Sequence, residues 1–483
     1  MASTTPLPSD HRLEPTSDLR RLSAGRILVG GAPLTIVRLS EAGTKAVDSW
    51  FAGEPVGQDP SHQHLARRLL ANGMAHPILG QRTKQPLPAL TVIIPVRNDS
   101  AGLEQTLASL DGNMAAVVVG DDGSDVPVSI PSAAGVSNLA IIRNEVALGP
   151  GRARQQGLAK VKTQTVLFID AGVEIKPAGL DHLLRHLEDE TLVAVAPRIV
   201  SPPESHLVGR YEQRRSALDL GPTPSLVGPG RAVPYVPTAC LAAQANALEQ
   251  CGGFDPDLRY GEDVDLVWRL GKLGDVRYVA EVEARHPPRS TIVALMTQRW
   301  SYGTAATPLA ERHDDAVSPA RLSSWSVAVA SLLIAGHPLA AAALAVGTAR
   351  ALQPKIAPMP AVSVEAALLA GRGHWYGGLS MLTALARTWI PLAGLAALLF
   401  PSQRRRIGLT VGAAFTRRVL DGPRQPGPAA VDLALGVVDD LSYCAGVWQG
   451  SLRARSIKAL KPRFVSWPGP SRPDLHSRSD PKS

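Results

Sequence analysis

The middle of the chain alternates between short apolar runs of strand length and longer stretches with helical periodicity. The apolar runs are residues 90–96, 115–120, 139–144, 165–170 and 192–200. Strands that alternate with helices predict an α/β domain, in which helices cover a mixed, mainly parallel sheet of the Rossmann-like kind. In such sheets the functional residues lie just beyond the carboxyl ends of the strands. The pattern therefore indicates where a binding site should be sought.

A different pattern precedes this domain. Two short apolar runs separated by glycines predict a β-hairpin within residues 26–40. Amphipathic helices are expected at residues 41–53 and 62–76. A hairpin followed by short helices in so few residues predicts a small winged-helix-like module, which we place at residues 23–80.

The remaining boundaries follow from composition. Residues 1–22 are polar and rich in proline, which predicts a disordered lead. Residues 81–89 contain two prolines and would link the module to the α/β domain at residues 88–290. Residues 291–450 are expected to be helical, and residues 451–483 are expected to be a basic, disordered tail.

The helical region holds three apolar stretches. Residues 322–349 contain no Lys, Arg, Asp or Glu and are long enough to span a bilayer. Gly336-His337-Pro338 interrupts this stretch, so a pair of buried helices is the alternative. Residues 388–400 and 407–415 are shorter, and the arginine triplet between them would suit a cytoplasmic flank. We expect contact with the cytoplasmic face of the cell membrane, with a wholly cytoplasmic protein as the alternative.

The composition and the charge of the chain argue against several classes of protein. The chain has three cysteines and no Cys-x-x-Cys pair, which argues against a disulfide scaffold and against a cysteine-ligated zinc site. Residues 451–483 carry eight Lys and Arg against two Asp, which suits an anionic membrane face or a solvated tail. No zinc-finger, RNP or homeodomain pattern accompanies this charge, so nucleic acid is not an expected partner. The first residues lack the pattern of a secretory signal.

Charged residues and glycines follow the predicted strands. Residues 91–99 are a strand that ends in Pro-Val-Arg-Asn, residues 117–125 lead into paired carboxylates, and residues 166–175 hold a strand that ends in an aspartate. Residues 148–159 form a glycine-rich turn that opens a helix with two arginines, and such a helix start suits a diphosphate. Each motif alone is common where an ordinary strand passes into a turn. Their order along the chain favours a nucleotide site.

A second acidic group opens a predicted helix. Glu262, Asp263 and Asp265 stand within four residues, immediately before the apolar-periodic segment 266–273. The helix dipole stabilises carboxylates at a helix start, which is the structural explanation. Closely spaced carboxylates also raise the pKa of one of their number, which suits a general base. The residues alone leave both explanations open.

Together these motifs resemble glycosyltransferase family 2, whose members bind nucleotide sugars with the GT-A fold. The matching residues are Pro95, Arg97, Asn98, Asp121, Asp122, Gly123, Ser124, Arg154, Asp170, the segment 252–255 and the segment 262–266. The resemblance covers residues 90–290 and implies an inverting transferase that uses a nucleoside-diphosphate sugar. It implies donor binding by Pro95, Arg97, Asn98, Asp121, Asp122, Arg154, Asp170 and Arg299.

The resemblance also implies individual roles. Asp121 and Asp122 would contact the nucleoside, and Asp170 would lie near the ribose and the diphosphate. Asp263 would be the general base that deprotonates the acceptor hydroxyl, with Glu262 beside it as a second catalytic residue. Arg299 stands in a shortened form of a motif of the processive synthases and would face the diphosphate. A helix-surface arginine is the alternative for Arg299.

The expected divalent metal, Mg²⁺ or Mn²⁺, is where the chain departs from the family. The DxD motif usually supplies a second carboxylate, whereas this chain reads Asp170-Ala171-Gly172. Glu174 is a candidate substitute, and His286 resembles a histidine that follows the acceptor segment in some relatives, with a plain loop histidine as the alternative. We expect Asp170 and His286 to hold the metal, more weakly than a site with two carboxylates would.

The N-terminal segment carries a second resemblance. Residues 21–56 resemble the PqqD-like peptide-binding winged helix, and their fusion to a family 2 domain is similar to the mycofactocin-system glycosyltransferases over most of residues 20–450. This implies a peptide-derived acceptor, premycofactocin, and glucose delivered by UDP- or GDP-glucose. Two alternatives remain: a transferase for a lipid or cell-wall glycan, and a non-catalytic protein that binds sugar nucleotide and peptide.

Overall fold

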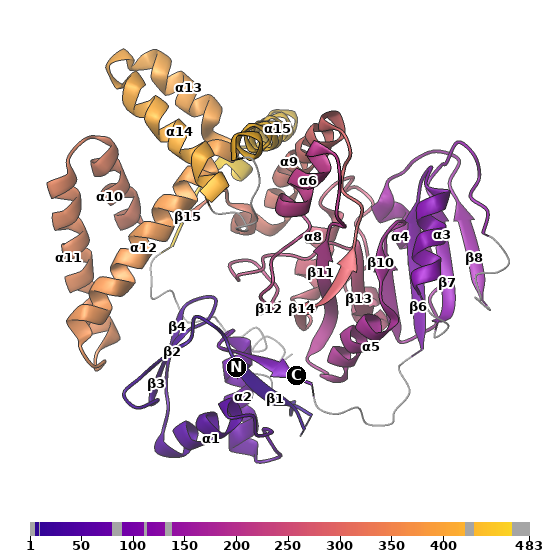
Figure 1. Ribbon diagram of the computed structural model, residues 1–483, viewed down its shortest axis with the longest axis horizontal. Coiled ribbons are helices and arrows are strands. Elements are labelled where there is room, and N and C mark those ends of the chain that lie inside the picture. The colour runs from indigo at the N-terminus through magenta and orange to yellow at the C-terminus, as the bar shows by residue number, and fades with distance from the viewer. Residues whose placement is uncertain are drawn as a thin grey trace, which may run out of the picture. The chain divides into compact units, whose positions relative to one another are not determined.

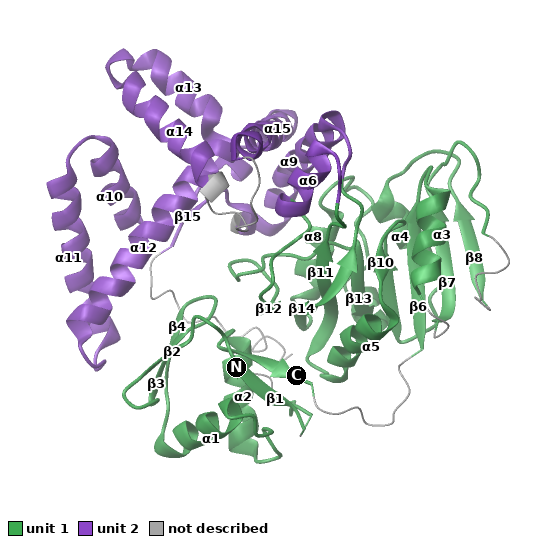
Figure 2. Ribbon diagram, in the orientation of Figure 1, with its two compact units in different colours: residues 1–203, 216–288, 476–483 green, residues 204–215, 289–475 purple. Residues whose placement is uncertain are grey.

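The computed structural model describes residues 5–8, 10–79, 89–110, 114–130, 138–420 and 429–465. These residues fold into two compact units (Figure 2). Unit 1 holds the described residues up to Pro203 together with Ser216–Pro288, and unit 2 holds Glu204–Arg215 together with the described residues from Arg289 onward. Unit 2 therefore takes one short segment from within the sequence of unit 1.

A nine-stranded sheet lies at the centre of unit 1 (Figure 1). Its order is β10-β14-β11-β13-β9-β6-β7-β8, and β12 pairs with β14. The strands are β6 (Leu90–Val96), β7 (Met114–Asp121), β8 (Leu139–Arg143), β9 (Thr165–Ile169), β10 (Glu174–Ile175), β11 (Leu192–Val200), β12 (Ser225–Leu226), β13 (Cys240–Gln244) and β14 (Asp275–Arg285). All five predicted strands are present.

The strand pairing confirms the expected mixed sheet. The β9-β6-β7-β8 part of the sheet is parallel, as is the pairing of β11 with β14. However, β13 runs antiparallel to both β9 and β11, and β10 and β12 run antiparallel to β14. The sheet is therefore mixed and mainly parallel, as predicted, because the parallel ladders join more residues than the antiparallel ones. The antiparallel strands β10 and β12 have only two residues each, which gives no apolar pattern in the sequence.

Helices begin where the parallel strands end. Helix α3 (Ser100–Ser109) follows β6, and Asp99 caps it by accepting a hydrogen bond from the Gly102 amide. Helix α4 (Pro150–Leu158) follows Gly149, whose φ of 100° requires glycine. The other helices of this domain are α5 (Pro177–Arg185), α7 (Ala245–Gln250) and α8 (Glu262–Leu270). The core beneath the helices consists of Val, Ile and Leu from the strands, so the strand ends are held rigidly.

The N-terminal segment has its own small core. It contains β1 (Arg12–Pro15), β2 (Arg20–Leu22), β3 (Ile27–Gly30), β4 (Thr35–Arg38), β5 (Ala75–Ile78), α1 (Glu41–Phe51) and α2 (Pro60–Ala71). The predicted hairpin is the antiparallel pair β3 and β4, and both predicted helices form. The expected disordered lead is wrong for the described residues, because β1 pairs with β5, and both Leu7 and Leu13 are buried in this core. The predicted linker lies almost entirely outside the described residues.

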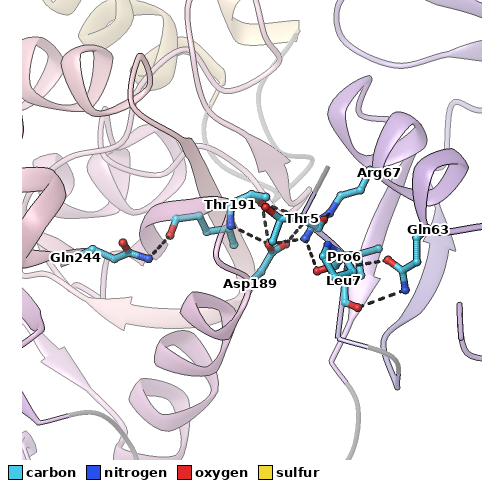
Figure 3. Close-up of polar contacts among 9 residues, drawn as sticks. Thr5, Pro6, Leu7, Gln63, Arg67, Asp189, Thr191 and Gln244 are labelled. Carbon is cyan, nitrogen blue, oxygen red and sulfur yellow. Dashed lines mark hydrogen bonds and ion pairs between the residues drawn. The ribbon is translucent and has the colours of Figure 1, made fainter. Parts of the chain in front are cut away.

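A buried ion pair joins this segment to the sheet domain within unit 1 (Figure 3). Arg67 on α2 donates from Nη1 to Asp189 Oδ2 at 2.6 Å and from Nη2 to Asp189 Oδ1 at 2.8 Å. Arg67 Nη1 also reaches Thr191 Oγ1, and Arg67 Nε donates to the carbonyl of Thr5. Both charged side chains are buried. A bidentate arginine–carboxylate pair is directional as well as strong, so α2 is held against the turn that precedes β11.

Unit 2 is built from helices. They are α6 (Leu207–Arg215), α9 (Ile292–His313), α10 (Ser324–Ile334), α11 (Pro338–Ile356), α12 (Val362–Ala384), α13 (Ile390–Leu399), α14 (Arg404–Leu420) and α15 (Ala429–Ala454). Helices α9 and α15 pack with their backbones in contact, because a Cβ at Gly303 would collide with the Tyr443 carbonyl and a Cβ at Gly446 with the Trp300 carbonyl. Only glycine permits this approach.

The structure also changes the expectation for the C-terminal residues. Residues 451–465 are not disordered: α15 continues to Ala454, and β16 (Arg463–Phe464) pairs in parallel with β15 (Arg321–Leu322). Residues 466–483 lie outside the described residues.

One run of helix stands out among the apolar segments. The stretch 322–349 divides at Gly336 into α10 and α11, as the interruption in the sequence predicts. Helix α12, a π-helical turn at Leu385–Trp389 and α13 together form one continuous helical run, Val362–Leu399. Among the described residues this is the one helix long and apolar enough to cross a membrane, and little of it is buried. A single such helix is weak evidence for membrane association.

Candidate active site

The loops after β6 and β7 are tied together by Asn98. Its φ of 54° lies in the left-handed region, where asparagine is tolerated. Its backbone amide donates to Ser124 Oγ, its Nδ2 donates to Asp125 Oδ2, and its Oδ1 accepts from the Asp125 amide. The neighbouring Arg97 is exposed, whereas Pro95 lies inside the buried strand β6. Of these three predicted donor residues, only Arg97 and Asn98 stand at the open strand end.

The paired carboxylates after β7 organise the surrounding loops. Asp121 accepts from the amides of Ser124 and Val128 and forms an ion pair with Arg143 at 2.5 Å. Asp122 accepts from Asn144 and from the amides of Leu148 and Gly149. Asp121 and Asp122 are both buried. Asp122 therefore shapes the glycine-rich turn before α4, and any contact of this pair with a nucleoside stays a prediction.

Arg154 on α4 connects the carboxylates of two other motifs. Its Nη2 lies 2.5 Å from Asp170 Oδ1, and its Nη1 lies 3.2 Å from Glu262 Oε1. The guanidinium is buried, and Phe254 lies over it at 5.7 Å from the ring centre. Asp170 stands one residue beyond β9, so Arg154 brings the end of that strand together with the start of α8. Its charge is balanced by these carboxylates, and a direct contact with the donor diphosphate stays a prediction.

The catalytic candidates lie at the start of α8. Gly261, with φ 76°, turns the chain into the helix, so Glu262 and Asp263 fall in its first turn. The glycine-rich turn comes close, because a Cβ at Gly151 would stand 2.9 Å from Glu262 Cγ. Glu262 is buried and Asp263 is half-buried. The sequence therefore needs a glycine at 151 to leave room for the Glu262 side chain.

Burial makes both carboxylates weaker acids. Desolvation, followed by the charge of Asp263, raises the pKa of Glu262 to about 7, and the positive charge of Arg154 opposes this shift. Desolvation also raises the pKa of Asp263. A carboxylate with a pKa near the working pH can accept a proton in one step and release it in the next. The pair is therefore suited to general-base chemistry.

Other acidic and polar groups near α8 are structural. Asp265 forms an ion pair with Arg269 one turn later, and Arg269 also donates to the carbonyls of Cys251 and Gly253. Gln155 on α4 accepts a hydrogen bond from the Phe254 amide. These contacts hold the glycine-rich turn at residues 252–255 against α4 and α8. Asp265 therefore has a structural role, and the catalytic roles of Glu262 and Asp263 stay predictions.

The metal-ligand prediction gains one residue that the motif comparison missed. Gly172 has φ 83°, a conformation that an aspartate rarely adopts, and the position of a Cβ there would lie 3.8 Å from Asp99 Oδ2. Asp99 thus brings a carboxylate oxygen near the position from which the usual motif would extend its second carboxylate, and a role as metal ligand is a prediction. Glu174 instead bonds Gln105, and His286 Nδ1 lies 2.7 Å from the Pro287 carbonyl oxygen. The only signal for Asp99 in the sequence was its place next to Asn98.

Arg299 has a different setting from the one the motif suggests. It is 2 % exposed and belongs to unit 2. Its Nη2 lies 2.5 Å from Glu212 Oε1, and its Nε lies 3.0 Å from Asp439 Oδ2. Arg299 is therefore neither a helix-surface arginine nor a cation without a partner. Two buried carboxylates already balance its charge, which favours a structural role over the predicted contact with a diphosphate.

Comparisons with known proteins bear on this arrangement. The model of the family described as "Glycosyl transferase family 2" matches residues 91–241. Two proteins called "Pre-mycofactocin glycosyltransferase", from strains CDC 1551 / Oshkosh and ATCC 25618 / H37Rv of Mycobacterium tuberculosis, are each 34% identical over 477 residues. The alignment covers 96% of this chain and 99% of each relative.

Solved structures show weaker likeness. A mannosyltransferase of Pyrobaculum calidifontis in complex with GDP-Man and Mn²⁺ is 15% identical over 76% of this chain and 91% of that chain, with a TM-score of 0.41. GalNAc-T7 with UDP, GalNAc and Mn²⁺ is 18% identical over 42% of this chain and 44% of that chain, with a TM-score of 0.33. Likeness at this level says nothing about what this chain binds.

The sheet and the family match together confirm the predicted GT-A-like α/β class, while the winged-helix likeness of the N-terminal segment stays a prediction. The family model covers the strands whose ends carry Asp121, Asp122 and Asp170. The relatives extend the match through α8 and unit 2 to nearly the full length of both chains. The chain therefore belongs to glycosyl transferase family 2 and is a glycosyltransferase.

Proposed function

We propose that this glycosyltransferase moves glucose, with inversion, from UDP- or GDP-glucose onto a peptide-derived acceptor, pre-mycofactocin, in mycofactocin biosynthesis. The observation that carries the proposal is the 34% identity to proteins named for that acceptor, which extends over 96% of this chain and so includes the N-terminal segment. A transferase for a lipid or cell-wall glycan is the second candidate, favoured by the apolar helix Val362–Leu399.

The geometry supports inverting chemistry in a simple way. A single displacement at the anomeric carbon needs one base on the acceptor side and charge stabilisation at the leaving diphosphate. Asp263 in the first turn of α8 would take the acceptor proton, and Glu262 would hold Arg154 in place. Arg154 also binds Asp170, so the acceptor side and the donor side share one buried network.

A divalent metal would be held by Asp99, Asp170 and His286. Asp99 and Asp170 offer carboxylate oxygens, the ligands that Mg²⁺ and Mn²⁺ prefer, and Asp99 Oδ2 lies beside Gly172, two residues from Asp170. His286, whose Nδ1 lies 2.7 Å from the Pro287 carbonyl oxygen, would be the third ligand. When bound, the metal would neutralise charge on the leaving diphosphate.

The pH profile of transfer should be set by the carboxylate pair. A base must be deprotonated to act, and the fold raises the pKa of Glu262 to about 7 and raises that of Asp263. We expect kcat/KM to rise with pH and to level off above about pH 7. In Arg154→Gln the charge that lowers both pKa values is lost, so the rise should move to higher pH. Arg152→Gln, on the same helix, is the control and should keep the wild-type profile. A flat profile, or a shift to lower pH in Arg154→Gln, would contradict the assignment.

A mass-spectrometric assay tests the proposed reaction. The full-length chain is incubated with UDP-glucose, GDP-glucose, UDP-galactose or GDP-mannose, together with Mn²⁺ and the pre-mycofactocin acceptor. We expect mass gains of whole hexose units with one glucose nucleotide and none with Asp263→Asn. Transfer to an added polyprenyl phosphate but not to the peptide-derived acceptor would favour the second candidate. Undiminished transfer in excess chelator would remove the metal from the mechanism.

The N-terminal segment is proposed to capture the acceptor. Its three-stranded sheet β2-β3-β4 has open edges to which an extended peptide could add as a strand, and this would raise the acceptor concentration near the active site. Deleting residues 1–79 should preserve donor hydrolysis, while transfer at low acceptor concentration falls and recovers partly at high concentration. A truncated chain that equals the full-length one at every acceptor concentration would exclude capture. An insoluble truncated chain would show that the segment acts as a structural cap, held by Arg67 and Asp189.

We also propose attachment to the cytoplasmic face of the cell membrane. The helical run Val362–Leu399 exposes apolar side chains that a bilayer would cover, among them Trp375, Leu398 and Leu399. The arginines at 404–406 follow it directly and suit the anionic cytoplasmic surface. Sedimentation of the full-length chain with phosphatidylglycerol vesicles tests this, because a soluble cytoplasmic protein would stay in the supernatant.

A further inference from the structure

We propose that His182, His186 and Glu281 form a binding site for a first-row transition-metal ion, for which Zn²⁺ is the best match. None of these residues belongs to the donor or acceptor cluster described above. Two imidazoles and one carboxylate are a common set of protein ligands for zinc, and they leave a fourth position for water. The proposal concerns an ion that is separate from the Mg²⁺ or Mn²⁺ of the transfer reaction.

The two histidines share one face of a short helical segment. His182 lies in the last turn of α5, and His186 begins the 3₁₀ turn His186–Glu188 that continues it. Residues four apart on a helix are neighbours on its surface. The two rings meet edge to face, with their centres 5.4 Å apart. Both can therefore turn a ring nitrogen toward one point.

Glu281 on β14 completes the set. Its Oε1 lies 3.7 Å from Nε2 of His182 and 3.7 Å from Nε2 of His186. All three ligand atoms lie within 4.8 Å of one another. Zinc bonds of about 2.0–2.2 Å in a tetrahedron place ligand atoms about 3.4 Å apart. A movement of less than about one ångström at each side chain would close the site around an ion.

A second observation points to a missing ligand. The His186 side chain is 3 % exposed, and within the described part of the chain its Nε2 has no hydrogen-bond partner. Buried polar nitrogens in native proteins are nearly always satisfied. This nitrogen faces the Glu281 carboxylate at a distance too long for a hydrogen bond. A metal ion between them would satisfy both groups.

The site is also open to solvent on one side. His182 and Glu281 are both partly exposed, with side-chain exposures of 38% and 47%, so an ion and its remaining water have access. The 3₁₀ turn that His186 begins is followed directly by Asp189, the partner of Arg67. A metal ion would fasten this turn to β14 and so steady the residue that holds the N-terminal segment.

The test is a metal titration of the full-length, tag-free chain after treatment with chelator. Isothermal calorimetry with ZnCl₂ should show one site per chain, and Zn²⁺ should raise the unfolding temperature. His182→Asn and Glu281→Gln should each weaken Zn²⁺ binding at least about tenfold, since even residues that only orient metal ligands contribute about 10–100-fold. Both variants change partly exposed side chains. His64→Asn on α2 is the matched control and should bind Zn²⁺ like the wild type.

Two outcomes would overturn the proposal. One is a wild-type chain with no Zn²⁺ site, and the other is unchanged affinity in both His182→Asn and Glu281→Gln. Asp170→Asn separates the two metals, because it should keep the Zn²⁺ site while it loses the ion of the transfer reaction. The titration contains no sugar nucleotide and no acceptor, so its result does not depend on the proposed function.

Discussion

Asp263→Asn should lower the rate of sugar transfer by about 10²–10⁴-fold, the usual contribution of a positioned general base. The amide has nearly the shape of the carboxylate but cannot take a proton from the acceptor hydroxyl. Arg154, Asp170 and Glu262 keep their mutual contacts in this variant. Donor affinity, measured by calorimetry with the sugar nucleotide, should therefore change little. The loss should appear in kcat and should persist at high pH.

Asp257→Asn is a suitable control for this experiment. Asp257 is exposed and lies in the same segment as the start of α8, so its variant should transfer sugar like the wild type. Turnover within a few-fold of wild type in Asp263→Asn would remove Asp263 from the base role. Glu262 would then be the next candidate for the base, and Glu262→Gln would test it. This variant also changes a partner of Arg154.

Arg299→Leu should destabilise the protein by about 3–5 kcal/mol, because it removes the cation that two buried carboxylates share. Asp439 keeps another arginine, Arg387, whose Nη1 lies 3.8 Å from Asp439 Oδ1. Glu212 and Asp439 are both buried, and both bond the guanidinium. Thermal unfolding of the purified chain should show the loss as a lower transition temperature. Arg299→Lys keeps the charge but not the fork of donors, so its loss should be smaller.

The same variants separate the structural role from the donor role. If Arg299 acts within unit 2 alone, Arg299→Lys should bind the sugar nucleotide with wild-type affinity while its stability falls. A large loss of donor affinity with unchanged stability would instead restore the predicted contact with the diphosphate. Arg453→Leu, an exposed arginine of the same unit, should change neither quantity.

The sequence located the strands and their chemistry because both signals are local. Runs such as residues 92–96 and 166–169 are apolar at every position. Asp121 ends its strand, and Asp122 and Asp170 come directly after theirs. The start of α8 was visible for the same reason, as three carboxylates placed before an apolar-periodic segment. Local composition also marked the break at Gly336.

Contacts between distant residues could not be read in this way. Nothing near residue 154 shows that its guanidinium bonds carboxylates 16 and 108 residues away. In the sequence Asp99 had no role beyond its place at the end of the segment 91–99, and only the folded chain brings it beside Gly172. Leu7 and Leu13 lie among polar residues and prolines, so the lead seemed disordered until β1 and β5 paired. Arg299 matched a sequence motif, but its two carboxylate partners, Glu212 and Asp439, favour a structural role.

The origin of unit 2 from two separate parts of the sequence governs how the chain can fold during synthesis. Helix α6 emerges from the ribosome before most of unit 2 exists, yet Glu212 pairs with a residue 87 positions later, and Tyr211 bonds a residue 228 positions later. Contacts at such separations form slowly. Until α9 and α15 have been translated, α6 presents an uncovered tyrosine and an unpaired glutamate. An expression fragment that ends at residue 288 would keep this state permanently, which makes it a poor choice for isolating the transferase domain.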